Sequence, residues 1–510
     1  MCAIATDYSK LCKKNKGAML IIAQQIDADG GAIFMQRLNR QHIGNSQRYP
    51  EKIIQFGSGN FLRAFVDWQI ELMNKKAGFD AGVTVIQSTN RGAVDKLNEQ
   101  EGLFTVYIRG IANGRVVQQH EVVTCVNRGI HVSKQYPLFI EIAQNPDLRF
   151  VFSNTTEAGI CFKQEPFIED VPPQTFPGKL TVLLYKRFQY FRGALDKGLI
   201  IIPCELIEKN GEVLRKTILQ YAEHWGLNSD FIDWVYKANT FCNSLVDRIV
   251  SGYPKNEIEH FVEQLGYEDQ LLTVAEPYYL WVIEGPDWLE NELPFRQAGL
   301  NILLVDDLTP YRKRKVRILN GLHTALTPIG HLFGCRTVRD VMQNETIRVY
   351  MDRLVNDEII PMLDLPRDEI RTFVREVFER FNNPFIDHYL SSIALNSMAK
   401  FRTRNLPTLL SYIKQIGRLP KHLVFSLSAL IVFYKEGSHV DDSEISQLCR
   451  LLWEDEDGSD RHLYNIVRTI LGYKDLWGQD LNDIPELTDL VFTYLAIIER
   501  KGIKEAIQQI

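Results

Sequence analysis

Three side chains in one segment of the chain could together perform acid–base chemistry on an alcohol or a ketone. Lys315, Asn320 and His323 are spaced five and three residues apart. If the segment is helical, they fall within roughly a 140° arc and about 12 Å of helix axis. Alcohol oxidation without a metal needs such a set, in which a base takes the hydroxyl proton and neutral donors hold the developing oxyanion.

A lysine acts as a base at neutral pH only when burial and neighbouring positive charges disfavour its charged form. Desolvation at a domain interface, with Arg314 and Arg317 alongside, would do this for Lys315. The alternative is a solvated basic helix end over residues 312–317, with His323 as a core histidine. Binding of nucleic acid through this segment is disfavoured, because it needs a wider basic face than one segment of an acidic chain provides.

A glycine-rich turn stands between an expected strand and an expected helix. The strand covers Lys52–Phe56, the turn is Gly57-Ser58-Gly59-Asn60, and the helical pattern runs over residues 61–75. Glycines let the backbone approach a dinucleotide pyrophosphate, and a helix N-terminus offers free N–H groups to it. Leu62 occupies the place of the third glycine of the usual fingerprint, so a purely structural turn is the alternative.

The choice between NAD and NADP stays open at this stage. The second expected strand, 83–87, is followed by Ser88-Thr89-Asn90-Arg91 and lacks the acid that usually binds the adenosine ribose. Arg91 could instead contact a 2′-phosphate. Residues 152–157 leave a strand end with small polar side chains, which is where open α/β sheets bind ligands. An ordinary polar turn is the alternative there.

The elements that must position these residues predict two domains after a leader. Strands expected at 52–56, 83–87, 105–109, 149–152 and 199–203 alternate with helices, as in a doubly wound, Rossmann-type parallel sheet. Beyond residue 307, segments with helical periodicity dominate. We therefore expect a weakly structured leader over 1–50, an α/β dinucleotide-binding domain over 51–306 and an all-α catalytic and substrate-binding domain over 307–510.

Composition excludes several other classes of protein. The 510 residues are 45% hydrophobic with a net charge of -6, which argues against a nucleic-acid coat protein and against disorder. No apolar run approaches the ~18–20 residues of a membrane span. The eight cysteines form no CxxC pair and the eleven histidines no HExxH motif, so no metal site is expected. We expect a cytoplasmic enzyme.

Several segments together resemble a known family. They are Phe56-Gly57-Ser58-Gly59-Asn60-Phe61-Leu62-Arg63-Ala64-Phe65, Ser153-Asn154-Thr155-Thr156-Glu157-Ala158-Gly159, Leu245-Val246-Asp247-Arg248-Ile249-Val250-Ser251, the Lys315-x4-Asn320-x2-His323 motif, and residues 380–384 and 396–404. The chain resembles the long-chain polyol (mannitol) dehydrogenase family from about Ile53 to its C-terminus.

The resemblance implies a role for each matching residue. Lys315 would be the general base in oxidation and the acid in reduction, and His323 would orient the substrate oxygen. Asn320 and Asn210 would form the oxyanion hole, although Glu205-Leu206 departs from the Asp-Asn of mannitol-type members. The expected cofactor-binding residues are Phe56, Gly57, Ser58, Gly59, Asn60, Phe61, Arg63, Asn154, Thr155 and Glu157, and the expected substrate-binding residues are Asp247, Lys400, Arg402 and Arg404.

The resemblance also implies a reaction. It is hydride transfer between NAD(H) and a keto-uronate/aldonate pair, D-tagaturonate to D-altronate, with one of the two arginines, Arg402 or Arg404, binding the substrate carboxylate. The alternatives are fructuronate/mannonate or mannitol/fructose as the substrate pair, or an NAD-binding sensor without turnover. The expected partner is a small sugar acid, without nucleic acid or membrane, and the oligomeric state stays open.

Overall fold

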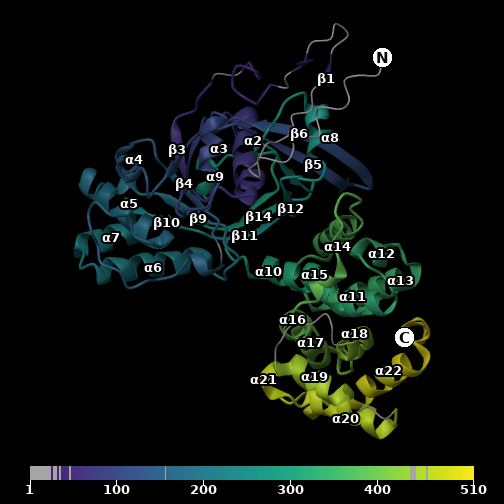
Figure 1. Cartoon of the computed structure of the whole chain (residues 1–510). Helices are drawn as coiled ribbons and strands as arrows, with labels where there is room; N and C mark the ends of the chain where they lie inside the picture. The colour runs from purple at the N-terminus through teal and green to yellow at the C-terminus, as the bar shows by residue number, and fades with distance from the viewer. Residues whose placement is uncertain are drawn as a thin grey trace, which may run out of the picture.

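The computed structural model describes residues 25–26, 32–33, 36–44, 47–155, 157–436, 444–454 and 458–510. Figure 1 shows an α/β unit, purple to teal, followed by a helical unit, green to yellow. Strand β15 (Ile302–Val305) ends and helix α10 (Thr309–Lys315) begins on either side of residue 307, where we expect the domain boundary. The predicted fold class, a doubly wound α/β domain plus an all-α domain, is confirmed.

A six-stranded parallel sheet forms the centre of the first domain. Its order is β10 (Thr240–Phe241), β9 (Ile200–Pro203), β8 (Phe150–Ser153), β3 (Glu51–Phe56), β4 (Gly82–Gln87), β7 (Val126–His131). Strands β4 and β9 are buried throughout because helices cover both faces of the sheet. From β3 the chain continues to β4 and then β7 on one side of β3 in the sheet, and it then crosses to β8 on the other side of β3. The crevice at the carboxyl ends of β3 and β8 is therefore the switch point where such sheets bind ligands.

Two smaller sheets complete this domain. One has the order β12 (Val250–Gly252), β13 (Thr273–Ala275), β5 (Phe104–Ala112), β6 (Arg115–Val123), and the other β11 (Asn243–Asp247), β14 (Leu280–Glu284), β15. The strand expected at 105–109 exists as β5, but it pairs antiparallel with β6 and lies outside the parallel sheet. Our placement of that strand among the βαβ units is therefore wrong.

Most helices of the first domain lie between strands of the parallel sheet. The described residues of the second domain form helices and one isolated bridge. The former include α2 (Trp68–Ala77), α3 (Val94–Glu99), α4 (Tyr136–Glu141), α5 (Phe176–Tyr190), α6 (Asn210–His224) and α7 (Ser229–Ala238). The latter include α11 (Gly321–Leu332), α12 (Val338–Gln343), α13 (Glu345–Arg353), α14 (Arg367–Phe381), α15 (Leu390–Ala394), α16 (Ser397–Arg404), α17 (Leu406–Ile416), α18 (Lys421–Phe433), α19 (Glu444–Glu454), α20 (Asp460–Leu471), α21 (Lys474–Trp477) and α22 (Leu487–Lys501). None of the described helices has the length and apolarity to span a membrane.

The described part of the expected leader is attached to the first domain. Leu38 is buried against Leu103 and Tyr267. The buried Arg40 guanidinium donates to the backbone oxygens of Glu101 and Thr124, at 3.2 and 2.9 Å. The expectation of a loosely attached leader is therefore wrong for residues 36–44. The remainder of residues 1–35 lies largely outside the described residues.

A buried arginine joins two connections of the first domain, the one before β8 and the one before β9. The Arg187 guanidinium donates to the carbonyl oxygens of Ala143, Asn145, Leu148 and Lys197 at 2.6–3.1 Å. Burial lowers the pKa of Arg187 to about 10. A buried carbonyl oxygen can only accept a hydrogen bond and therefore needs a donor. The Arg187 guanidinium supplies the donors for these four carbonyls.

Arg187→Met should leave these carbonyls without their donor and lower the free energy of unfolding by about 3 kcal/mol or more, since each buried unsatisfied acceptor costs ~1–3 kcal/mol. Urea unfolding followed by circular dichroism measures this. The exposed Arg450 supplies the control, since Arg450→Met should change stability by less than about 0.5 kcal/mol. Equal stability of the two variants would contradict the assigned role.

Candidate active site

The glycine turn leaves room for a ligand at its outer glycine. Gly57 has φ +123° and its N–H donates to Ile86 O at 3.0 Å. A Cβ on Gly57 would lie 3.0 Å from Leu62 Cδ1 and 3.1 Å from Asn154 O, so a side chain does not fit there. A Cβ on Gly59 would meet nothing within 4 Å. The turn therefore fits the close approach of a pyrophosphate at Gly59, followed by the N-terminus of a continuous helix over residues 60–77.

Arg63 braces this turn from behind. Its guanidinium is buried and donates to Ser58 O at 2.6 Å, Asn60 Oδ1 at 2.6 Å and Thr273 Oγ1 at 3.1 Å. Burial lowers the pKa of Arg63. The side chain expected to contact a cofactor instead fixes the backbone that would contact it, and it also ties the Asn60 side chain to the turn.

The other turn residues divide into core and rim. Phe56 is fully buried and its ring packs on Phe176 at 4.8 Å. Phe61 is partly buried and stacks on Phe65 at 4.9 Å. The Ser58 hydroxyl accepts a backbone hydrogen bond from the residue before α3. Phe56 and Ser58 thus serve the fold of the turn, whereas Gly59 and Asn60 are exposed and Phe61 is partly exposed.

The second strand end is held by a buried carboxylate. Asn154 Nδ2 donates to Cys204 O at 2.6 Å, and both N and Oγ1 of Thr155 donate to Glu205 Oε1 at 3.0 Å. Burial raises the pKa of Glu205 despite these donors. Strands β8 and β9 are therefore joined at the crevice. The side chain of Glu157 lies outside the described part of the structure.

Lys315 crosses the boundary between the two domains. Its Nζ donates to Val246 O at 2.8 Å and lies 3.7 Å from Asp247 Oδ1. Asp247 also receives two hydrogen bonds from the Arg380 guanidinium, at 2.9 and 3.2 Å. The same guanidinium lies 2.9 Å from Glu276 Oε1. Two cations of the helical domain thus meet two carboxylates of the first domain, and we call these four residues the junction cluster.

The junction cluster sets the ionisation of its acids. Burial raises the pKa of Asp247, but the charges of Arg380 and Lys315 outweigh burial, so the pKa lies below its ordinary value. For Glu276 burial outweighs the attraction of Arg380 and the pKa is raised. The two carboxylates in turn raise the pKa of Arg380 although burial opposes this. Asp247, expected to contact substrate, has its oxygens engaged by these two cations and instead positions Lys315.

The two arginines expected to disfavour the lysine's charge point elsewhere. The buried Arg314 guanidinium donates to Glu369 Oε1 at 2.5 Å. Arg317 donates to Arg404 O at 3.2 Å. The charged group that lies beside the Lys315 ammonium is a carboxylate, so the expected arrangement of flanking cations is wrong.

The helix that carries the three motif residues changes its pitch between them. After α10 the backbone is a π-helix over Val316–Asn320, and α11 follows. In an α-helix, positions five apart diverge by ~140°, whereas π-helical i→i+5 bonding places them closer to one face. The pitch change therefore turns Asn320 toward the face of Lys315. The partly exposed Asn320 amide has no hydrogen-bond partner in the described part of the chain.

His323 lies beside the junction cluster as a neutral imidazole. Its ring centroid is 4.3 Å from that of Phe381 and 4.9 Å from that of His388. Burial, with added repulsion from His388 and from cations that include Arg404 and Lys400, lowers the pKa of His323 well below its ordinary value. Its Nε2 is buried without a hydrogen-bond partner among the described residues. A neutral imidazole with a free nitrogen can orient a substrate oxygen.

Asn210 is part of the core. It is fully buried, and its Nδ2 lies 3.0 Å from the carbonyl oxygens of Pro203, Glu205 and Ser244. Its Oδ1 accepts the backbone N–H of Ser244 at 2.8 Å. These contacts join β9, α6 and β11 and use both amide hydrogens. The structure therefore contradicts the expected place of Asn210 in the oxyanion hole.

Helix α16 presents one of its two arginines to the site. Arg404 Nη1 donates to Thr324 Oγ1 at 3.2 Å, one residue after His323, and burial lowers the pKa of Arg404. Arg402 is exposed, and its Nη2 lies 3.5 Å from the Cβ position of Gly478, at the opposite side of the helix. The structure thus places Arg404 on the side of the helix that faces His323 and Arg402 on the other side, a difference that the sequence does not show.

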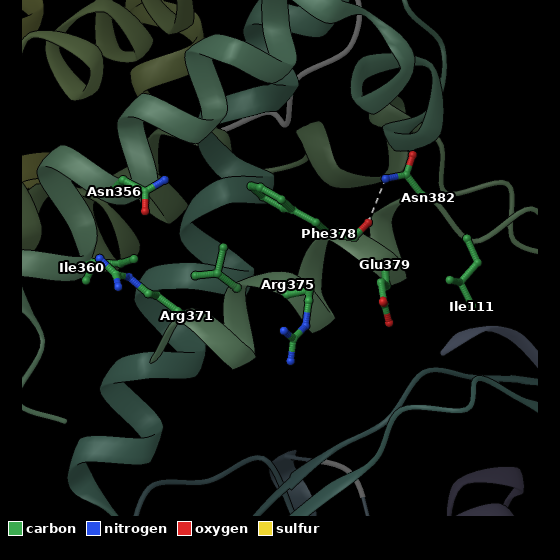
Figure 2. Close-up of a pocket in the computed structure, with 9 residues that line it drawn as sticks. Ile111, Asn356, Ile360, Arg371, Arg375, Phe378, Glu379 and Asn382 are labelled. Carbon is green, nitrogen blue, oxygen red and sulfur yellow. Dashed lines mark hydrogen bonds between the residues drawn. The ribbon is translucent and has the colours of Figure 1, made fainter. Parts of the chain in front are cut away.

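One small cavity borders the motif residues and a larger one does not. The small cavity has a volume of about 10 Å³ and is lined by Ile249, Leu319, His323, Val338, Arg380, Phe381, Ile386 and His388. Lys400 lies nearby and donates to Ile393 O at 2.9 Å. A larger cavity of about 430 Å³ is lined by residues of α14, by Asn356 and Ile360, and by Ile111 of β5 (Figure 2). Arg375 and Glu379 border it, and none of the motif residues does, so its size does not mark the reaction site.

In the described part of the chain, no three His, Cys, Asp or Glu side chains gather at a distance that could hold a metal ion. The sequence predicts no role for Arg380 itself, although residues 380–384 resemble a segment of the family, and it does not indicate Glu276 or His388. The contacts of these residues have no signal in a single sequence, because partners such as Arg380 and Asp247 lie 133 residues apart along the chain.

Comparisons with known proteins find two matching family models and several similar relatives. The model of the mannitol dehydrogenase Rossmann domain matches residues 51–297, and that of the mannitol dehydrogenase C-terminal domain matches residues 307–498. An altronate oxidoreductase of Bacillus subtilis is 48% identical over 476 residues, covering 93% of this chain and 98% of its own. One from Yersinia enterocolitica is 45% identical over 480 residues, covering 93% and 99%.

Two solved structures share the fold. Mannitol 2-dehydrogenase of Pseudomonas fluorescens, in complex with NAD and D-mannitol, is 23% identical with a TM-score of 0.65, covering 93% of this chain and 99% of its own. A substrate-free D-sorbitol dehydrogenase is 21% identical with a TM-score of 0.75, covering 92% and 100%. At these identities the likeness shows the fold alone.

Arg380→Met should leave Glu276 without its cation and Asp247 with Lys315 alone, and it should lower the free energy of unfolding by about 3–5 kcal/mol. Loss of the Arg380 charge raises the pKa of both buried acids in the variant, so they take up protons at pH 5 and stay ionised at pH 8. Buried ionised carboxylates without their cation destabilise the fold, so the deficit should be larger at pH 8 than at pH 5. Urea unfolding at both pH values measures it.

Arg375→Met, on the exposed side of the same helix, is the matched control and should cost less than about 0.5 kcal/mol at either pH. A deficit for Arg380→Met that does not change between pH 5 and pH 8 would contradict the junction cluster as described.

Proposed function

The chain belongs to the mannitol dehydrogenase family, and from this membership we propose that it reduces D-tagaturonate with NADH to D-altronate and catalyses the reverse oxidation. It is an NAD-dependent dehydrogenase that acts on CH–OH groups. The choice of substrate is supported by relatives at 45–48% identity over 93% of the chain, which are altronate oxidoreductases. The observation that carries the mechanism is the position of Lys315 at the domain boundary, held by Val246 O and Asp247.

NADH, when bound, supplies the hydride that reduces the ketone carbon. The residues that fit it are those of the glycine turn, where Gly59 leaves open space and Gly57 has no room for a side chain. No acid follows β4, and Arg91 there is exposed, so these residues do not reject a 2′-phosphate. NAD is the cofactor of the proposal, and the assay below compares it with NADP.

Lys315 moves the proton. An ammonium has three hydrogens, of which one goes to Val246 O and one faces the ionised Asp247, so the third is available to the substrate oxygen. In reduction this hydrogen is transferred to the oxygen as the C–O double bond becomes a C–O single bond. In oxidation the amine takes it back. Asn320 and His323 are the neutral donors that hold the oxygen between these states.

A uronate differs from a neutral ketose by its carboxylate. Arg404, which lies one residue from His323 through its contact with Thr324, provides a guanidinium on the site side of α16. Lys400 is one helical turn earlier on the same face and would contact the hydroxyl groups. We assign the carboxylate to Arg404, because Arg402 lies toward Gly478 on the other side of the helix.

Lys315→Ala should reduce kcat for D-tagaturonate by about 10²–10⁴-fold, which is the contribution of a positioned acid or base. The Kd of NADH, from quenching of tryptophan fluorescence, should stay within about threefold, because the lysine lies in the helical domain and the glycine turn in the other. NADH absorbance, with NADPH in parallel, measures turnover. Unchanged kcat would refute the role of Lys315.

The same assay decides the substrate. D-fructuronate and D-fructose should turn over at least tenfold less efficiently than D-tagaturonate, and equal kcat/KM values for the neutral ketose would rule out the proposed substrate. Loss of all turnover with intact NADH binding would indicate a sensor.

Arg404→Met should raise the KM for D-tagaturonate by roughly 10- to 100-fold, from the ~1.5–3 kcal/mol of a hydrogen bond to a charged group. Arg402→Met is the matched control on the same helix and should change KM by less than about twofold. A larger effect of Arg402→Met than of Arg404→Met would reverse the assignment of the carboxylate site.

A further inference from the structure

A buried amide connects the glycine turn to an acid on the helix that directly follows the turn. Gln55, on β3, is fully buried, and its Nε2 lies 3.2 Å from Gly57 O and 3.2 Å from Asp67 Oδ2. Asp67 is also fully buried, at the end of the π-helical turn Arg63–Asp67. The Gln55 side chain thus holds the first carbonyl of the turn on one side and a carboxyl group on the other.

Each of these two side chains has one oxygen without a partner. Gln55 Oε1 and Asp67 Oδ1 are both buried and make no hydrogen bond in the described structure. Both atoms are acceptors when Asp67 is ionised, so they cannot satisfy each other in that form. The residues around them leave no space for a water molecule; they are Gln55, Ser58, Arg63, Asp67, Val85, Ala93, Leu97, Phe104 and Leu271.

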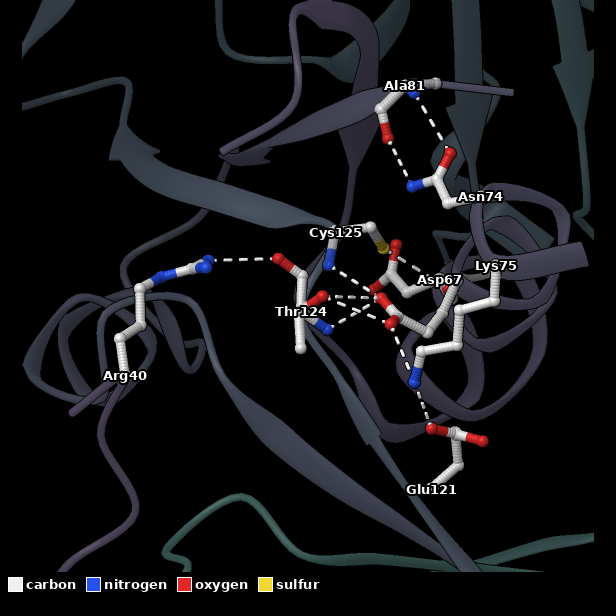
Figure 3. Close-up of polar contacts among 9 residues, drawn as sticks. Arg40, Asp67, Asn74, Lys75, Ala81, Glu121, Thr124 and Cys125 are labelled. Atoms are coloured by element: carbon white, nitrogen blue, oxygen red, sulfur yellow. Dashed lines mark hydrogen bonds and ion pairs between the residues drawn. The ribbon is translucent and has the colours of Figure 1, made fainter. Parts of the chain in front are cut away.

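The charged groups that face Asp67 do not neutralise it. Burial raises the pKa of Asp67 and outweighs the charge of Arg63, one turn earlier, which lowers it. The Nη atoms of Arg63 donate to the turn and to Thr273, and its buried Nε makes no hydrogen bond among the described residues. The Cys125 thiol donates to the backbone oxygen of Asp67 at 3.4 Å and not to its carboxyl group. Figure 3 shows Lys75 directed to Glu121, away from Asp67, and it also pairs with Glu71.

We propose that Asp67 is protonated in the folded enzyme and forms a reciprocal acid–amide pair with Gln55. This pair positions the glycine turn through the Gly57 carbonyl. In this pair Gln55 Nε2 donates to Asp67 Oδ2, and the hydroxyl on Oδ1 donates to Gln55 Oε1. One proton then satisfies both unpartnered oxygens. Burial raises the pKa of Asp67 to about 7, which agrees with a carboxyl group that is neutral below that pH.

The pair gives the turn a pH dependence. Below pH 7 the amide is held in one orientation and supports Gly57 O. Above pH 7 the ionised acid loses its donor bond and places a negative charge beneath the site proposed for the pyrophosphate, so NADH affinity should fall. The sign for folding is the same: an acid whose folded pKa is raised stabilises the native state below its unfolded pKa, ~3.9, and this contribution is lost as the pH rises through about 7.

The test is NADH binding by the full-length protein at pH 6, 7, 8 and 9. It rests on the proposed function only in the choice of NADH as the ligand. For the wild type, Kd should rise several-fold to tenfold for each pH unit above 7. Asp67→Asn carries a permanent amide donor in place of the hydroxyl, so it should bind NADH as tightly as the wild type at pH 6 and keep that affinity to pH 9. Asp67→Ala should bind more weakly at every pH, with a flat profile.

Glu71→Gln is the matched control, because Glu71 is equally buried one turn further on and accepts hydrogen bonds from the backbone N–H groups of Thr124 and Cys125. It should keep the wild-type slope. A slope that persists in Asp67→Asn, or equal profiles for Asp67→Asn and Asp67→Ala, would overturn the proposal.

A second measurement does not depend on a ligand. The infrared difference spectrum between wild type and Asp67→Asn at pH 6 should contain the C=O stretch of a protonated carboxylic acid, and its absence would overturn the proposal. If Asp67→Asn does not fold, the difference spectrum between wild type and Asp67→Ala should contain the same band at pH 6 and lose it by pH 9, and its absence would overturn the proposal. Presence of the band without any binding of NADH would indicate that the proposed function fails while the acid–amide pair stands.

Discussion

The junction cluster is the constraint on which the rest of the site depends. Lys315 and Arg380 come from the helical domain, and Asp247 and Glu276 come from the first domain. The four charges balance, and because they are largely buried, removing any one leaves an opposite charge without compensation in a region where that is costly. The two domains are therefore fixed relative to each other at this point. The lysine gains its position from charges that belong to the other domain.

Much of the fold could be predicted from the sequence because its signals are local. The run Ile200–Pro203 is apolar throughout, as a strand covered on both faces must be, and it is the buried strand β9. The strand at 105–109 was found too, but alternation of residues does not say which strand is its neighbour, and β5 pairs outside the parallel sheet. The burial of Arg40 could not be predicted either, because the carbonyls that accept its hydrogen bonds lie 61 and 84 residues away along the chain.

The site was predictable in its residue types and less so in its contacts. The spacing of Lys315, Asn320 and His323 predicted a shared helix face, but the π-helical turn that brings Asn320 toward Lys315 has no signal in the sequence. Arg402 and Arg404 are two apart, so they point to nearly opposite sides of α16, and only the packing of the helix shows which side faces the site. The roles of these residues stay predictions.

The two halves of the site are connected through neighbouring residues of one short segment. Asp247 faces Lys315, and the next residue, Arg248, turns the other way, donates to Ala64 O at 2.7 Å and lies 4.3 Å over the Trp68 ring. Ala64 belongs to the π-helical turn directly behind the glycine turn. The proposed reaction requires a hydride at carbon and a proton at the adjacent oxygen, so their sources must keep a fixed separation. For that reaction the Asp247-Arg248 pair would fix the separation, because Asp247 holds the lysine and Arg248 holds the helix that follows the glycine turn.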